Sequence, residues 1–134
     1  MTEQQRGPAF AREIPQQIFI GGWREGTSER VLEDRNPFDD SLIASIRQAS
    51  QADVDEAYAL AEEAQREWAA RTPAERSAVL TRAADYFEAN SEEMARMLSA
   101  ESGSSAIKAA KEIGLAVAAT REAATFPTRV HGLI

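Results

Sequence analysis

The tripeptide Glu101-Ser102-Gly103 places a carboxylate next to a hydroxyl, which are residue types that can take part in catalysis. A carboxylate acts as a general acid or base only with a partner within hydrogen-bond reach. The sequence shows no such partner for Glu101. Gly103 instead predicts the end of a helix through a positive φ angle, and Ser102 can bond to nearby backbone. We therefore expect a structural role for all three residues.

The chain has no cysteine and a single histidine, His131. The missing cysteine excludes disulfides, thiolate metal sites and a cysteine nucleophile. A histidine base or zinc ligand needs partner residues held close to it, and none is recognisable near His131. We expect this side chain to be exposed or incidentally packed. The sequence therefore predicts no catalytic and no metal-binding residue.

The segment Gly21-Gly22-Trp23 superficially resembles a phosphate-binding loop. Such a loop needs several glycines that open a helix, as in G-x-G-x-x-G or G-x-x-x-x-G-K-S, and neither pattern occurs in the chain. A tight turn that lets Trp23 fold back onto neighbouring strands is the better interpretation. We predict no cofactor-binding residue in this chain.

Three pairs of adjacent acidic residues could suggest acid–base catalysis. Adjacent helical residues, however, point about 100° apart and cannot act on one substrate together. We interpret these pairs as solvated faces. Three single apolar residues fall on helical stripes and are expected in a core or an interface. The pairs are Asp39-Asp40, Glu62-Glu63 and Glu92-Glu93, and the apolar residues are Trp68, Met94 and Met97.

The composition allows one domain with a thin core. Leu, Ile, Val and Phe make up 25 of the 134 residues, and alanine accounts for much of the 43% hydrophobic content. That share lies just under the level of about 20% at which a core becomes thin. Alanine buries little area, so we expect a marginally stable chain that another part or subunit completes.

The net charge of −7 argues against nucleic-acid or anionic-membrane partners, since phosphate binding needs clustered Lys and Arg. Residues 1–6 lack the basic start and apolar run of a signal peptide. No uncharged stretch approaches the roughly 18 residues of a membrane span. We expect a cytoplasmic protein.

The positions of prolines, glycines and apolar runs predict short strands within about residues 17–47, after a mobile leader over residues 1–16. We expect a hairpin or meander, with a turn at Asn36-Pro37 because proline pushes the preceding residue out of the helical region. The predicted strand segments are Gln17–Ile20, a stretch that reaches Val31-Leu32, and Ser41–Ile46 as a third short strand.

Helical periodicity begins at Ser50, which forms a capping-box pattern with Asp53 and predicts a first helix over about residues 51–71. Thr72-Pro73-Ala74-Glu75 combines a threonine cap, a proline at the first position and a glutamate at the third. This pattern predicts a second helix of about four turns.

Asn90, followed three residues later by Glu93, is expected to cap a third helix that Gly103 ends. Ser104 or Ser105 should begin a fourth helix, which stops before Phe126-Pro127. The helices thus fill about residues 51–125. The fold class predicted is α+β, with short N-terminal strands followed by about four helices.

The order and spacing of four landmarks resemble the N-terminal segment of the NAD(P)-dependent aldehyde dehydrogenase superfamily over about residues 17–134. They are Ile18–Trp23, Asn36-Pro37-Phe38, Trp68 and Glu101-Ser102-Gly103. Ser104 stands where relatives usually have lysine, and Phe38–Ser41 replaces their usual Gly-Glu turn. The segment from Glu101 to Pro127 looks most like members that oxidise aromatic aldehydes such as benzaldehyde or vanillin.

The resemblance implies a larger α/β enzyme in which a cysteine thiolate attacks the aldehyde, hydride passes to NAD or NADP, and a glutamate activates water. It also implies that the present region packs against the cofactor domain. None of the family's catalytic or cofactor motifs has a counterpart in this chain, since there is no cysteine and no Pro-Trp-Asn. We therefore predict that the chain alone has no dehydrogenase activity.

The leading hypothesis is the N-terminal portion of an aldehyde dehydrogenase, from a gene fragment, an interrupted frame or one piece of a split enzyme. Its partner would be the remainder of the enzyme or another subunit. A stand-alone helical interaction module is one alternative, because apolar faces often bind partners. A nonfunctional remnant that aggregates through its bare faces is another.

Overall fold

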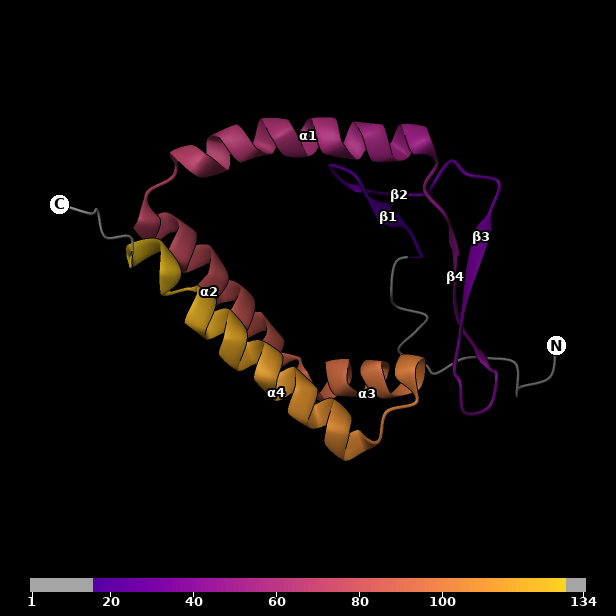
Figure 1. Ribbon diagram of the computed structural model, residues 1–134. Helices are drawn as coiled ribbons and strands as arrows, with labels where there is room; N and C mark the ends of the chain where they lie inside the picture. Colours follow the sequence, from indigo (N-terminus) through magenta and orange to yellow (C-terminus); the bar gives the residue numbers. More distant parts are fainter. Residues whose placement is uncertain (1–15, 130–134) are drawn as a thin grey trace. The chain divides into compact units, whose positions relative to one another are not determined.

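The computed structural model describes residues 16–129, which form four short strands, four α-helices and one 3₁₀ helix (Figure 1). The α+β class predicted from the sequence is confirmed. Nearly all of the expected leader, and His131, lie outside the described residues. The chain divides into two compact units. Of the described residues, unit 1 comprises 16–66 with Ala100–Gly103, and unit 2 comprises Glu67–Ser99 with 104–129.

The first two strands of unit 1 form a tight antiparallel hairpin. β1 (Ile18–Phe19) pairs with β2 (Trp23–Arg24). The turn between them depends on Gly21, whose φ of 65° is costly for residues with a Cβ. Trp23 folds back onto Phe19 with the rings edge to face, 5.4 Å between centroids. The predicted turn is confirmed.

A second antiparallel pair joins β3 (Val31–Arg35) to β4 (Leu42–Arg47), with a register irregularity at Asp34 and Arg35. The two pairs form separate two-stranded sheets, so the alternative of one continuous meander is wrong. The predicted turn at Asn36-Pro37 is confirmed. Asn36 Oδ1 accepts from the Phe38 N–H at 2.9 Å, and the Asn36 carbonyl accepts from the Asp40 N–H at 2.8 Å.

The first two helices begin where their capping signals predict. α1 (Gln51–Ala70) starts after Ser50, whose Oγ accepts from the Asp53 N–H at 3.2 Å while the Ser50 N–H donates to Asp53 Oδ2 at 2.8 Å. α2 (Pro73–Ala89) has the full capping box of Thr72 and Glu75. The Thr72 N–H donates to Glu75 Oε2 at 2.8 Å.

α3 (Ser91–Ser102) corrects one expectation. Asn90 does not cap it: the Asn90 side-chain amide donates to the Tyr86 carbonyl of α2 at 2.8 Å. With α2 and α3 separated by this single residue, the asparagine side chain satisfies the C-terminal carbonyls of the helix before it. Gly103 follows α3 with a φ of 67°, as predicted for a helix end.

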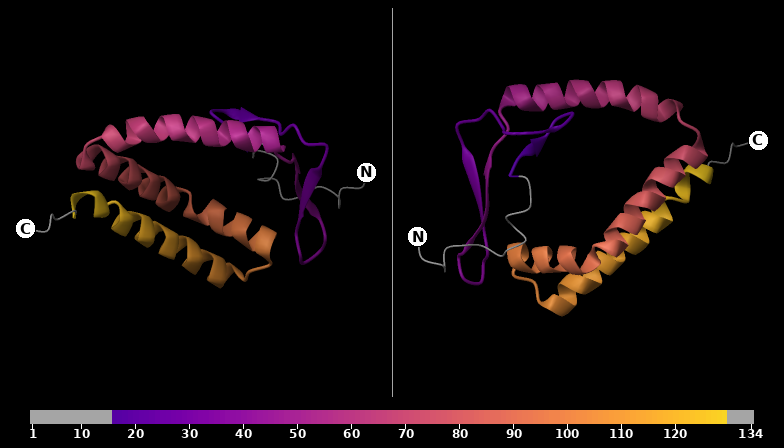
Figure 2. Two further views of the ribbon diagram at one scale, coloured as in Figure 1. Left: turned by 45° about the horizontal axis from the view of Figure 1, so that its top comes forward. Right: turned by 180° about the vertical axis from the view of Figure 1, so that it is seen from behind.

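α4 (Ala106–Ala123) is capped by Ser105, whose Oγ accepts from the Lys108 N–H at 3.3 Å, and the 3₁₀ helix η3 (Phe126–Thr128) follows it. α2 and α4 lie side by side and antiparallel in every view (Figures 1 and 2). Fully buried Ala84 and Ala109 belong to these two helices. Small side chains at such positions let helix backbones approach closely, but each buries little area.

Candidate functional site

Asp53 is the buried polar residue of unit 1, with 3% of its surface exposed. Its Oδ2 accepts from the Thr27 N–H at 2.8 Å and the Thr27 hydroxyl at 2.7 Å, besides the Ser50 N–H. Arg24 Nη2 donates to Oδ1 at 3.1 Å and to Glu56 Oε2 at 2.6 Å. We call Arg24, Thr27, Ser50, Asp53 and Glu56 the Asp53 cluster. It ties β2 and the following loop to the start of α1.

The bonds at Asp53 stabilise its charged form. The backbone N–H groups of Ser50 and Thr27, and then the Thr27 hydroxyl, hold the pKa of the Asp53 carboxyl well below its usual range despite burial. A carboxylate that stays ionised, with both oxygens engaged, cannot exchange a proton with a substrate near neutral pH. The cluster therefore acts as a structural clamp.

The family-like tripeptide lies beside a carboxyl group that sequence reasoning missed. Partial burial, the negative charge of Asp34 and a hydrogen bond to it raise the pKa of the Glu101 carboxyl. Asp34 comes from β3, 67 positions earlier, and no local signal links the two residues. Gly103 packs against Pro37: a Cβ built there would lie 3.0 Å from Pro37 Cγ. The positive φ and this close approach fit the structural role predicted for Gly103.

The structure also shows where the acidic pairs and the three apolar helix residues lie. The acidic pairs are exposed, as expected for solvated faces, and Arg66 pairs with Glu62 at 2.9 Å. Trp68, Met94 and Met97 are half-buried, between the core and the solvent. Among residues 16–129 no group of three or more His, Cys, Asp or Glu side chains could hold a metal ion. None of the helices described is long and apolar enough to cross a membrane.

The glycine pair does not fit a dinucleotide. Gly21 and Gly22 join two strands, whereas a pyrophosphate cradle presents backbone N–H groups at a helix N-terminus. Gly22 has open space around it, with nothing within 4 Å of a Cβ built there. The glycine is thus not needed for close packing at that position.

The apolar surface is the most distinctive feature of the described residues. The buried hydrophobic residues are Ile43, Ala84, Ala109 and Ala124, and no large side chain is fully buried in the described part. Large apolar side chains instead stay more than half exposed in both units. They include Phe19, Trp23, Phe38, Tyr58, Tyr86, Ile107, Leu115 and Phe126. A protein rarely leaves so many such groups in water unless another surface covers them.

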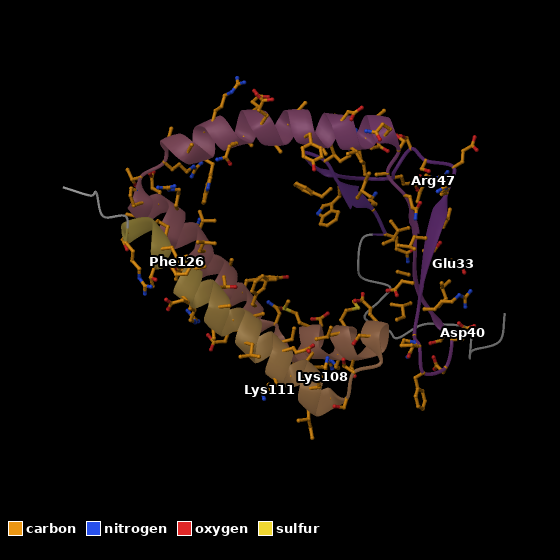
Figure 3. The ribbon with its side chains drawn as sticks, in the orientation of Figure 1. Glu33, Asp40, Arg47, Lys108, Lys111 and Phe126 are labelled. Atoms are coloured by element: carbon orange, nitrogen blue, oxygen red, sulfur yellow. The ribbon has the colours of Figure 1, made fainter. Side chains whose placement is uncertain are left out.

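Unit 2 carries an open apolar groove of about 390 Å³ between the ends of its helices. Figure 3 shows Phe126 at the C-terminal end of α4 beside α2, whereas Lys108 and Lys111 lie toward the other end of α4. The lining is apolar apart from one arginine. The residues that line the groove are Trp68, Arg76, Leu80, Ala123, Phe126 and Pro127.

Arg76 is the residue of this groove that sequence reasoning missed. Its Nε is shielded from solvent and has no hydrogen-bond partner. The sequence did contain a signal, since Arg76 stands four residues before Leu80 and so shares its face of the helix. An arginine on an otherwise apolar face is a candidate contact for an acidic group.

Comparison with known proteins places these surfaces in context. The sequence model of the aldehyde dehydrogenase family matches residues 23–134. A vanillin dehydrogenase from Corynebacterium glutamicum is 54% identical over 117 residues, and a benzaldehyde dehydrogenase from Bacillus subtilis is 44% identical over the same length. Each match covers 87% of this chain and 24% of the relative. The chain thus spans about a quarter of the length of these relatives.

Solved structures agree with the sequence comparison. The crystal structure of an NAD-dependent benzaldehyde dehydrogenase from Corynebacterium glutamicum superposes with a TM-score of 0.86 and 52% identity. This match covers 90% of the present chain and 27% of that structure. The sequence landmarks, the α+β arrangement and both comparisons agree, and the chain belongs to the aldehyde dehydrogenase family.

Proposed function

We propose that this chain provides the N-terminal part of an NAD-dependent dehydrogenase that oxidises an aromatic aldehyde to the carboxylic acid. The observation that carries the proposal is the 54% identity to a vanillin dehydrogenase, together with the 52% identity to an NAD-dependent benzaldehyde dehydrogenase. Both relatives act on aromatic aldehydes by their names, and one uses NAD.

The role proposed for the chain itself is to cover and brace the rest of the enzyme. Its described surface exposes large apolar side chains in both units while its core consists mainly of alanines. Burial of apolar area stabilises by about 25 cal/mol per Å², so docking these faces would stabilise both partners. The Asp53 cluster would keep the start of α1 in place while this occurs.

In this proposal, the catalytic residues lie outside this chain. The chain has no cysteine, and so the thiolate that forms the covalent intermediate must come from the remainder. NAD, when bound there, accepts the hydride. The glycine turn of this chain does not fit the cofactor, which supports the proposal that the chain alone catalyses no oxidation.

A chimera tests this proposal. The present chain replaces the matching N-terminal quarter of the Corynebacterium vanillin dehydrogenase, and NADH formation from vanillin and benzaldehyde is recorded. We expect an active chimera and no NADH from the 134-residue chain alone. An inactive chimera that fails to fold would contradict the proposal, and cooperative unfolding of the chain alone in that case would favour the interaction module.

A further inference from the structure

The groove of unit 2 combines apolar walls with an arginine that has no anionic partner among residues 16–129. Seven other described arginines pair with a carboxylate. Among them, Arg24 pairs with Asp53 and Glu56, Arg35 with Glu33, and Arg121 with Asp85 and Glu88. The Arg76 guanidinium makes no hydrogen bond and no ion pair with any described residue.

The environment of Arg76 makes the missing anion significant. Its Nε is shielded from water and has no acceptor. A guanidinium N–H that loses its bound water and gains no other acceptor destabilises the folded state. Arg24 also has a shielded Nε without a partner, but its terminal nitrogens bind two carboxylates. The terminal nitrogens of Arg76 have no carboxylate partner among the described residues.

The groove around the guanidinium has room for an apolar group as well. Trp68, Leu80 and Phe126 line it together with Arg76. Aromatic and arginine side chains in an apolar pocket are typical of the residues that dominate binding energy at protein interfaces. A ligand that fits must therefore place a carboxylate next to an apolar side chain.

We propose that this groove receives a polypeptide segment of the remainder of the enzyme, and that a carboxylate of this segment pairs with Arg76 while a neighbouring apolar side chain fills the groove. This inference rests on the function proposed above. Charge complementarity selects the occupant, because an apolar segment alone would leave the guanidinium desolvated and unpaired. The carboxylate forms a bidentate pair with the planar guanidinium.

The experiment compares the same substitution in two settings. Arg76→Met keeps an apolar stem and removes the charge, and it is made both in the 134-residue chain and in the chimera with the vanillin dehydrogenase remainder. Arg82→Met is the matched control, because Arg82 is exposed on the same helix and has no ion pair with the described residues. Thermal unfolding midpoints are measured for the wild type and both variants in each setting, and for Arg76→Lys in the chimera.

We expect Arg76→Met to leave the midpoint of the chain alone unchanged or slightly raised, since no internal partner is lost. In the chimera it should lower the midpoint by about 5 °C or more, because a buried carboxylate loses its partner. Arg82→Met should change neither midpoint by more than about 1 °C. Arg76→Lys, which keeps the charge without the planar fork, should recover part of the loss in the chimera.

Two results would overturn the inference while leaving the proposed function intact. The first is an active chimera in which Arg76→Met behaves like Arg82→Met, which would mean that apolar contact alone fills the groove. The second is a lowered midpoint for Arg76→Met in the chain alone, which would place the occupant within the chain or in a second copy. An Arg76→Met chimera that fails to fold, while the same variant of the chain alone folds normally, supports the pair. A wild-type chimera that does not fold overturns both proposals.

Discussion

The Asp53 cluster and the Arg76 groove differ in how their charged side chains are paired. In the cluster, Asp53 is 3% exposed and each of its oxygens accepts a hydrogen bond from within unit 1. In the groove, the Arg76 guanidinium lies among apolar side chains and has no partner among the described residues. Asp53 thus finds its partners within unit 1, whereas Arg76 has no carboxylate partner among the described residues.

The difference indicates which surfaces are complete within the chain and which need another polypeptide surface to cover them. Buried polar groups in folded proteins are almost always hydrogen-bonded, and exceptions need an explanation. The relatives are about four times as long as the matched region, which fits an explanation by a missing partner surface. Five predictions test the contrast, beginning with the change that should disturb the Asp53 cluster most.

The strongest way to break the Asp53 cluster is Gly26→Ala, next to Thr27. A Cβ at Gly26 would lie 2.1 Å from the Gln48 carbonyl oxygen and 2.6 Å from that of Arg47, so the backbone itself must move. We expect a loss of at least about 3 kcal/mol in the free energy of unfolding, measured by urea titration. Gly114→Ala is the control, since nothing lies within 4 Å there and alanine favours the helix by up to about 1 kcal/mol. Equal stability of the two variants would contradict the close approach.

Asp53→Asn should break the cluster electrostatically with almost no change in shape. An amide cannot accept from all the donors that now face the carboxylate, so buried N–H and hydroxyl groups lose a partner. We expect the thermal midpoint to fall by roughly 5 °C or more. Asp55→Asn on the same helix keeps an oxygen that can accept the exposed hydrogen bond from Gln51, and it should shift the midpoint by about 1 °C or less. A shift as large for Asp55 as for Asp53 would refute the clamp.

The difference between wild type and Asp53→Asn should also depend on pH. The pKa of Asp53 is lowered in the folded state, so its contribution is fully present above the unfolded value of about 3.9 and is lost as the pH falls through the folded value. The urea midpoints of the two proteins should differ by a constant amount above about pH 5 and converge in stronger acid. A difference that grows in acid would contradict this sign.

A smaller effect is expected at the start of the helix that carries Arg76. Thr72→Ala removes the capping hydroxyl of α2 and should cost about 1 kcal/mol of unfolding free energy. Thr81→Ala is the matched control, because its hydroxyl donates to the Ser77 carbonyl within the same helix at 3.0 Å. Alanine is well tolerated there, and the control should be neutral. A neutral Thr72→Ala would show that the cap contributes nothing.

The smallest effect should come from Glu101→Gln. The pKa of Glu101 is raised in the folded state, so its contribution is full below the unfolded value of about 4.3 and is lost as the pH rises through the folded value. The variant should therefore equal or slightly exceed the wild type near neutral pH, by no more than about 0.5 kcal/mol because Glu101 is exposed. Asp34→Asn should give the same sign, and a clear loss of stability in both would contradict the like-charge contact.

Local signals explain why the helix boundaries were predictable. The capping residues Ser50, Thr72 and Ser105 each bond to an N–H within three residues, and Gly103 adopts the positive φ that ends α3. Such interactions need only a short stretch of sequence. The predicted cap at Asn90 was wrong for a related reason. The sequence does not tell whether the Asn90 side chain bonds to the helix before it or to the helix after it.

Long-range contacts explain what the sequence did not show. Arg24 reaches Asp53 across 29 positions, and Asp34 meets Glu101 across a still longer separation. These pairings depend on where the strands lie against other elements, which no local pattern determines. The groove was only partly visible: the stripe with Trp68 was expected, but the position of Arg76 among apolar residues followed from the packing of η3 beside α2.

Amide hydrogen exchange, compared between the 134-residue chain and its chimera with the vanillin dehydrogenase remainder, tests the contrast most directly. We expect exchange to slow in residues 76–80 and at Phe126 and Thr128 when the remainder is present. The amides of Thr27 and Ser50, already bonded to Asp53, should change much less. Unchanged exchange around the groove, or slowing at Thr27 and Ser50 as large as in the groove, would contradict it.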